Sequence, residues 1–258
     1  MKLTFNERMF RQINDSIRKE RGHGSRFISI AERLIHNPIC AVLVGTGEFA
    51  ASFLLRLPIP IYSGLIYAWV TNSRGLPHYF GMYLRGLYYR GILGRMDSNV
   101  FIDQGVFFAY PKSVELSEFS YIDKNTIIMS KTARIGRRVH IAPRVFISGG
   151  GDFEIQDYAC IATNSNIITS TEVLKDGARC SGPMVSAKQR NVLRSQVRIL
   201  KDAFIGANVT ILPGVTVAQG SVIGAGVTLA KDTEPWGIYV CPRATLIAQR
   251  EPVIWEDD

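Results

Sequence analysis

The sequence of 258 residues predicts a mainly β fold, a left-handed parallel β-helix of hexapeptide repeats that follows an α-helical N-terminal region. Two observations predict it. Aliphatic residues recur at every sixth position in the second half, and basic and apolar segments with helical spacing fill the first third. The apolar fraction of 47% is enough to build a packed core, which excludes a disordered chain.

The six-residue period is strictest over residues 199–234. Its aliphatic positions are Ile199, Ile205, Ile211, Val217, Ile223 and Leu229, and the residue four positions after each of them is small or β-branched. A helix repeats every 3.6 residues and a strand every 2, so neither explains this period. The pattern predicts one short strand and one bend per segment, with three segments forming each triangular coil.

The same period continues upstream with interruptions. It appears at Ile155, Ile161 and Ile167, at Ile135, Ile141 and Ile147, and more loosely at Leu116, Ile122 and Ile128. The step of eight residues from Ile147 to Ile155 predicts a bulge near 149–151. The period is absent between Val173 and Ile199, which predicts that residues 174–198 form an inserted loop, often the binding face of a solenoid.

The N-terminal third holds all of the excess positive charge. Residues 1–95 contain 13 Lys and Arg against 5 Asp and Glu, whereas residues 96–258 contain 17 of each. Residues 3–17 and a segment starting near Ser29 have the spacing of amphipathic helices. The apolar segments 39–55 and 57–70 are interrupted by Glu48 and by prolines, so neither is a clean membrane span.

Two interpretations of this region stay open. Its apolar segments pack on the β-helix or a neighbouring subunit, or they lie on a membrane surface whose anionic lipids the basic residues would attract. No nucleic-acid motif accompanies the charge, so we expect no nucleic-acid partner. The predicted organisation is a helical region over 1–95, a β-helix domain over 96–250 with the inserted loop, and a tail over 251–258.

The cysteines and the N-terminal residues bear on location and metal binding. Cys40, Cys160, Cys180 and Cys241 form no close pair, which argues against a disulfide framework or a zinc site, and we expect no metal. The opening MKLTFNERMF has no apolar stretch of the kind found in signal peptides. We therefore expect a cytoplasmic protein, held at the inner face of the cytoplasmic membrane if residues 1–95 bind lipid.

Four segments carry a family resemblance that covers residues 83–250. The C-terminal coils and exit of hexapeptide-repeat acyltransferases resemble two of them, IGANVTILPGVTVAQGSVIGAGVTLAKD (205–232) and PWGIYVCPRATLIAQR (235–250). A narrower resemblance, to sugar O-acetyltransferases of surface-polysaccharide biosynthesis (lipopolysaccharide O-antigen or capsule), lies in GPMVSAKQRNV (182–192) and YLRGLYYR (83–90). The resemblance implies acetyl-CoA as co-substrate, a sugar or lipid-linked saccharide as acceptor, and a homotrimer.

The candidate base is His140. The other three histidines, His23, His36 and His78, lie outside the repeats, and His140 directly precedes inward Ile141, which puts its ring outside the core. Histidine suits proton transfer near neutral pH, and relatives of this type use one on the β-helix surface. Asp123 and Asp157 both remain candidates for the carboxylate that orients it. The run Gly149-Gly150-Gly151 is a candidate for the backbone donor to the oxyanion.

The resemblance also implies the binding residues. Gly206, Ala207, Gly224 and Ala225 would face the pantetheine arm of CoA, and Lys231 and Arg243 would meet its phosphates. The sequence Cys241-Pro242-Arg243-Ala244-Thr245 departs from the family's usual ending, so Arg243 is a substitute for a basic residue that is missing from its usual place. In the inserted loop, Arg190 and Asn191 are the candidate contacts to the sugar.

The sequence therefore predicts transfer of an acetyl group from acetyl-CoA to a sugar hydroxyl. Two alternatives stay open, N-acetylation of an amino sugar and a non-catalytic trimeric scaffold at the membrane. A carbonic anhydrase of this fold is excluded because it needs three histidine ligands. A sugar-nucleotide pyrophosphorylase is excluded because residues 1–95 contain no glycine-rich phosphate loop.

Overall fold

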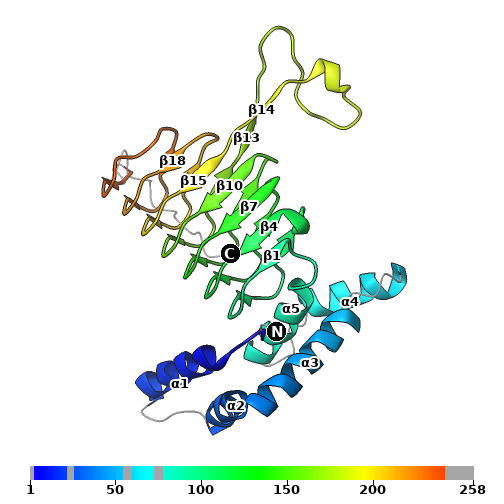
Figure 1. The fold of residues 1–258 in the computed structure, drawn as a ribbon. Coiled ribbons are helices and arrows are strands. Elements are labelled where there is room, and N and C mark those ends of the chain that lie inside the picture. The colour runs from blue at the N-terminus through cyan, green and yellow to red at the C-terminus, as the bar shows by residue number, and fades with distance from the viewer. Residues whose placement is uncertain (1–2, 22–25, 55–59, 73–77, 242–258) are drawn as a thin grey trace, which may run out of the picture.

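The computed structural model describes residues 3–21, 26–54, 60–72 and 78–241, and it confirms the predicted left-handed parallel β-helix (Figure 1). Five helices precede the coils and lie at the end of the stack where β1 begins. Their bounds are α1 (Glu7–Arg21), α2 (Arg26–His36), α3 (Pro38–Leu54), α4 (Pro60–Asn72) and α5 (His78–Tyr89).

Three parallel sheets form the sides of the prism, and each complete coil of the β-helix supplies one strand to each sheet, while β21 after the last complete coil joins sheet B alone. Sheet A contains β1 (Arg95–Met96), β4 (Val114–Leu116), β7 (Thr132–Ile135), β10 (Asp152–Ile155), β15 (Val197–Ile199) and β18 (Thr216–Val217). Sheet B contains β2 (Phe101–Ile102), β5 (Tyr121–Ile122), β8 (His140–Ile141), β11 (Cys160–Ile161), β16 (Phe204–Ile205), β19 (Val222–Ile223) and β21 (Ile238–Tyr239). Sheet C contains β3 (Phe107–Phe108), β6 (Ile127–Ile128), β9 (Phe146–Ser148), β12 (Asn166–Ile168), β17 (Thr210–Ile211) and β20 (Thr228–Leu229).

The core consists of aliphatic columns, one behind each sheet. Behind sheet B the column is Ile102, Ile122, Ile141, Ile161, Ile205 and Ile223, all with 0% exposure. Each buried side chain of this size contributes about 1.5–3 kcal/mol relative to exposure. Because the strands pair in strict register, the period of six in the sequence becomes a vertical stack of side chains in space. The first coil, with Met96, Ile102 and Phe108 six residues apart, extends the predicted series by one turn.

The inserted segment is a hairpin that projects away from the coils (Figure 1). Its antiparallel strands are β13 (Ser170–Glu172) and β14 (Val192–Arg194), and a short 3₁₀ helix covers Ala187–Gln189. It leaves the prism between β12 of sheet C and β15 of sheet A, which is the corner opposite sheet B.

The glycine run 149–151 packs against the base of this hairpin. Gly149 has φ +109°, and a Cβ there would lie 2.5 Å from the Ser170 backbone nitrogen. The Gly151 amide donates to Thr169 Oγ1 at 2.9 Å. Within one chain, the glycines therefore lie at the corner between sheets C and A, away from the sheet that carries His140, and their role as an oxyanion donor stays a prediction. Their close packing explains why glycine is needed here.

The helical region joins the coils through buried polar contacts. Tyr89 of α5 donates from its hydroxyl to the Val106 carbonyl at 2.8 Å, and so ties α5 to the first coil. Buried Glu48 of α3 accepts from the Thr4 amide at 2.7 Å and the Tyr83 hydroxyl at 3.0 Å, and pairs with Arg90 at 3.5 Å. These bonds explain a carboxylate inside an apolar helix.

No single helix among the described residues is long and apolar enough to cross a bilayer. Residues Ile28–His36 and Pro38–Leu54 reach that length and composition only as a pair, and the pair is bent by 102°.

Candidate active site

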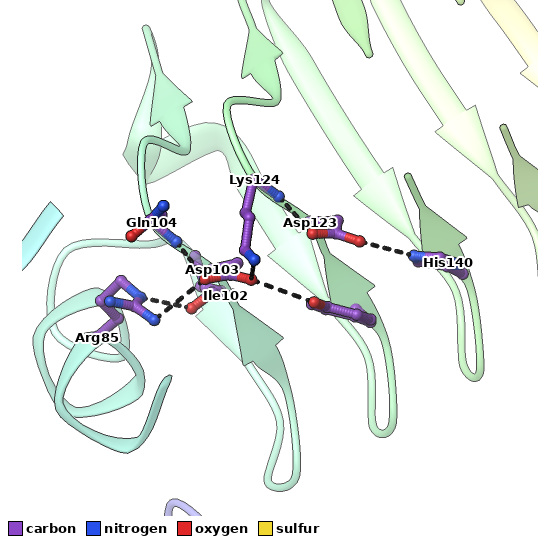
Figure 2. Close-up of polar contacts among 8 residues, drawn as sticks. Arg85, Ile102, Asp103, Gln104, Asp123, Lys124 and His140 are labelled. Carbon is purple, nitrogen blue, oxygen red and sulfur yellow. Dashed lines mark hydrogen bonds and ion pairs between the residues drawn. The ribbon is translucent and has the colours of Figure 1, made fainter. Parts of the chain in front are cut away.

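His140 lies on β8, with its ring on the outward face of sheet B. Its Nε2 is 3.4 Å from Asp123 Oδ2, and 42% of its side chain is exposed (Figure 2). Asp123 sits one coil earlier and is itself held by the Lys124 amide, which donates to Oδ1 at 2.6 Å. Asp157, the other candidate, instead accepts from the Arg137 amide at 2.7 Å. The structure therefore pairs His140 with Asp123.

A second chain of contacts reaches the imidazole from the same preceding coil as Asp123. The Tyr121 ring stacks on His140 with a centroid distance of 5.0 Å and an interplanar angle of 9°. The Tyr121 hydroxyl donates to Asp103 Oδ2 at 3.2 Å. Asp103 pairs with Arg85 of α5 at 3.3 Å, both almost fully buried, and Arg85 Nε donates to the Ile102 carbonyl at 2.8 Å. The N-terminal helices are thus connected to the histidine through two side chains.

Three residues of this chain of contacts were not among the predicted site residues, namely Tyr121, Asp103 and Arg85. The signal for Tyr121 was its place in the repeat, since it precedes inward Ile122 as His140 precedes Ile141. Asp103 and Asp123 likewise follow their inward isoleucines. Arg85 had no such signal because it comes from a helix outside the repeats.

The charges around His140 favour its protonated form. Hydrogen bonds with Asp123 and Cys160 raise the pKa of His140 to about 9, against the opposing effect of burial. Burial would raise the pKa of Asp123, but its bonds to His140, the Lys124 amide and Tyr121 prevail and lower it. Burial and the two neighbouring carboxylates raise the pKa of the Tyr121 hydroxyl. A pKa near 9 leaves only about 1% of His140 neutral at pH 7.

Small residues continue the surface from His140 toward the C-terminal coils. Ala142, Ala162, Gly206 and Gly224 occupy the same repeat position on four successive coils, because each amide bonds to the carbonyl of the next coil's inward residue. We call these four the small-residue track. At Gly206 a Cβ would lie 2.7 Å from the Ala225 amide nitrogen, so only glycine fits there. Ala207 and Ala225 follow in the next repeat position.

The track follows the corner between sheets B and C from the coil of β8 toward the last coils. Adjacent coils are roughly 4.8 Å apart, so the track runs roughly 14 Å from its first to its fourth coil. Its first residue, Ala142, is two positions beyond His140 on the same strand and turn. An extended chain lying along it would end beside the imidazole.

The other predicted binding residues lie elsewhere. Lys231 is exposed on the turn after β20, across sheet C from the track. Arg190 and Asn191 are exposed on the hairpin, at the corner opposite sheet B. Arg243 lies outside the described residues. Within one chain, the structure therefore gathers His140, Gly206, Ala207, Gly224 and Ala225 on one edge, and separates Lys231, Arg190 and Asn191 from them. Over residues 3–241, where described, no His, Cys, Asp or Glu group is placed to hold a metal ion.

Comparison with known proteins finds similarity to hexapeptide transferases and sugar acyltransferases. Residues 196–231 match the family described as bacterial transferase hexapeptide (six repeats). The chain is 32% identical over 118 residues to a dTDP-4-amino-4,6-dideoxy-D-glucose acyltransferase of Escherichia coli, covering 46% of this chain and 61% of that protein. It is 30% identical over 141 residues to galactoside O-acetyltransferase of Escherichia coli K12, covering 54% and 56%. The chain thus spans about three fifths of these relatives' lengths.

A solved structure matches the same coils. A variant of AntD, an N-acyltransferase from Bacillus cereus in complex with dTDP and coenzyme A, superposes with a TM-score of 0.54 at 25% identity. The match covers 58% of this chain and 80% of that one. Together with the strict repeat and the observed coils, these similarities show that this chain is similar to bacterial hexapeptide transferases over its β-helix, with the family's repeat itself at residues 196–231.

Proposed function

We propose that the protein is an acyltransferase that moves an acetyl group from acetyl-CoA to a hydroxyl of a sugar used in surface-polysaccharide biosynthesis. The observation that carries the proposal is the His140–Asp123 pair at the head of the small-residue track. A base with a carboxylate partner at the end of a row of small residues is what direct transfer from a long, thin thioester donor requires. Relatives named as sugar acyltransferases support the acceptor class.

The proposed reaction needs one proton transfer and no covalent enzyme intermediate. With Nε2–H donated to Asp123, Nδ1 of His140 carries the lone pair that accepts the proton of the acceptor hydroxyl. The hydroxyl oxygen bonds to the acetyl carbonyl carbon, and the carbon–sulfur bond then breaks to release the CoA thiolate. The proton on His140 passes to that thiolate, which returns the imidazole to its neutral form. Asp123 stabilises the imidazolium formed on the way.

The donor would lie along the small-residue track. Gly206, Ala207, Gly224 and Ala225 would contact the pantetheine arm, because larger side chains there would fill the path. Lys231 and Arg243 are the cations proposed for the phosphates. Since Lys231 lies across sheet C, it reaches phosphates that extend past the track, or those of a CoA held by a neighbouring subunit.

The acceptor site would be completed by a second subunit of a homotrimer. The hairpin projects from the corner opposite sheet B, so its Arg190 and Asn191 do not approach His140 of their own chain. Three large apolar side chains of the hairpin are exposed to water, Leu174 at 59%, Met184 at 103% and Leu193 at 51%. Leaving them in water costs free energy, which a partner surface would recover by covering them. In a closed threefold ring each hairpin would cover a neighbour's site.

N-acylation of an amino sugar is the second candidate. The E. coli dTDP-sugar acyltransferase and AntD are both named for amino-sugar or N-acyl transfer, and they favour it. The same His140 would then remove a proton from the attacking amine. The non-catalytic scaffold is the remaining alternative, and it predicts no stabilisation by CoA.

The test is a panel of hydroxyl and amino-sugar acceptors, free and nucleotide-linked, incubated with acetyl-CoA and the full chain. Neutral hydroxylamine cleaves O-acetyl esters and leaves amides intact. A product that hydroxylamine cleaves supports O-acetylation. A product that resists hydroxylamine supports N-acetylation of an amino sugar instead. Thermal unfolding with and without CoA runs in parallel, because a ligand of the folded state raises the melting temperature. No product with any acceptor and no thermal shift would favour the scaffold.

A further inference from the structure

Helix α3 exposes its apolar side chains and buries its polar ones. Six large apolar residues on one face of the helix are 54–70% exposed, namely Ile39, Val42, Leu43, Phe49, Phe53 and Leu54. At 100° per residue they fall within one arc of the helix. We call this set the outward face of α3. A water-exposed helix normally shows the opposite arrangement.

The buried side of α3 holds Gly45, Glu48 and Ser52. Glu48 is satisfied by Thr4, Tyr83 and Arg90, and the Ser52 hydroxyl donates to the Leu87 carbonyl at 3.1 Å. The helix is therefore fixed in this orientation by specific bonds to the rest of the protein. Rotating it to hide the outward face would leave a buried carboxylate or its partners unpaired.

Positive charge adjoins the outward face. A groove of about 370 Å³ between α1 and α2 is lined by Arg11, Asn14, Arg18, Ser29, Glu32, Arg33 and His36. Only one of these seven side chains is acidic, and Glu32 pairs with Arg11 at 3.3 Å. His36 ends α2, and Ile39 begins the outward face three residues later, so the cationic groove and the apolar face meet at the bend between α2 and α3.

We propose that the outward face of α3 inserts into one leaflet of an anionic lipid bilayer, with the cations of α1 and α2 at the headgroups. An apolar helical face flanked by basic residues is the arrangement of helices that lie in the membrane interface. At 17 residues α3 is roughly 25 Å long, long enough to lie along the surface. The bend of 102° after α2 suits an interfacial path.

A second copy of the chain fits this face less well. Residues 1–95 carry all of the net charge of +8, since residues 96–258 balance at zero. Joining two outward faces would bring two such regions together and add repulsion. An anionic bilayer attracts the same charge, at about 1 kcal/mol per cation near the surface. The positive charge of residues 1–95 therefore favours an anionic lipid surface over a second copy of the chain as the partner of the outward face of α3.

Vesicle flotation of the full chain tests the proposal without requiring acyl transfer. One vesicle set is phosphatidylcholine alone, and the other is phosphatidylcholine mixed with phosphatidylglycerol. We expect wild type to float with the mixed vesicles at low salt. The variant Leu43→Gln/Phe49→Gln/Phe53→Gln should partition roughly ten-fold more weakly or worse. Arg8→Gln/Arg18→Gln/Arg33→Gln should lose on the order of 100-fold on the anionic vesicles.

The matched control is Phe107→Gln/Tyr110→Gln/Tyr158→Gln, which removes three exposed aromatic side chains from the coils. Circular dichroism and light scattering of every variant establish that fold and mass are kept. The proposal fails if wild type ignores both vesicle sets, or if the coil control loses as much binding as the α3 variant. It also fails if the α3 variant dissociates a larger assembly and wild type does not bind lipid, because a second copy would then cover the face.

Discussion

The neighbours of His140 stabilise its protonated form. In that form it cannot act as the proposed base, so it can accept a proton only after the pH has risen enough to make it neutral. The pKa near 9 comes from Asp123 and from Cys160, the residue that occupies the same position one coil later. A base must be neutral to accept a proton. The residues that orient the imidazole therefore also fix the pH at which it can act.

The pH dependence of the rate follows from this conflict. We expect kcat/KM of the wild type to rise with pH through a midpoint near 9, rather than near the 6.5 of an unperturbed histidine. Asp123→Asn removes the anion that favours the imidazolium, so the midpoint should fall, while the rate drops on the order of 100-fold because the ring loses its orienting partner. A wild-type midpoint at 6.5 would contradict the contacts seen around His140.

The His140–Asp123 pair should also make the free energy of unfolding depend on pH, with a contribution that decreases as the pH rises. The folded pKa of His140 is raised, so its contribution to stability is complete below pH 6.5 and is lost as pH rises through about 9. Thermal unfolding of wild type and His140→Asn across this range measures the difference, which should shrink toward alkaline pH.

At the residue scale, the sequence could predict His140 but not its surroundings. The repeat register states which residue precedes each inward isoleucine, and this placed His140 outside the core. It left Asp123 and Asp157 equivalent, because both follow the repeat closely. The choice depends on the turn, where the Arg137 amide satisfies Asp157 and leaves Asp123 to His140.

Helix α5 is the element that links the N-terminal region to the site, through Arg85 and Asp103. Arg85→Met leaves Asp103 buried without its principal partner. We expect a loss of about 3 kcal/mol in the free energy of unfolding, near the low end for a broken buried pair because Lys124 Nζ remains 4.0 Å from Asp103.

Urea denaturation measures the effect of Arg85→Met, and the control is Arg85→Met combined with Asp103→Asn. The double variant should regain part of the stability, because neither buried charge is then unpaired. Equal stabilities of wild type and Arg85→Met would mean that this ion pair does not fix α5 on the first coil.

The small-residue track makes a second prediction at the element scale. Ala225→Phe places a ring beside Gly224 of the track at an exposed turn, so the fold should be kept while the apparent Kd for CoA rises roughly ten-fold or more. Ser113→Phe adds a ring to the exposed turn before β4, on the second coil, and should bind CoA as wild type does. Isothermal titration of both variants measures this. Equal weakening by the two variants would remove the track as the donor site.

Elements differ in how far the sequence determines them. The coils follow from local periodicity, since each inward aliphatic residue stacks on the next, and the first coil was visible in the same spacing. The hairpin was predicted only as an interruption, because its conformation depends on contacts far apart in sequence. The orientation of α3 was not predictable, because its sequence is apolar on every face. The orientation depends on the hydrogen bonds that Glu48 and Ser52 make with distant residues.

The whole molecule presents one chain's hairpin and histidine on opposite corners, so a site built from both requires two subunits. Coexpression of two variants tests the proposed homotrimer. The His140→Asn variant and the Arg190→Ala/Asn191→Ala variant should each be nearly inactive alone. Coexpressed, they should regain a part of the activity, because some sites of a mixed assembly then combine an intact histidine with an intact hairpin. No recovery on coexpression would place the acceptor contacts within a single chain.

The most direct test of acyl transfer with His140 as the base is CoA release from acetyl-CoA, with a sugar acceptor, by wild type and by His140→Asn. Loss of the general base should lower the rate on the order of 10²–10⁴-fold, with CoA affinity close to wild type and the fold kept by circular dichroism. If His140→Asn releases CoA as fast as wild type, the central claim is contradicted, and the base must be sought elsewhere on the β-helix.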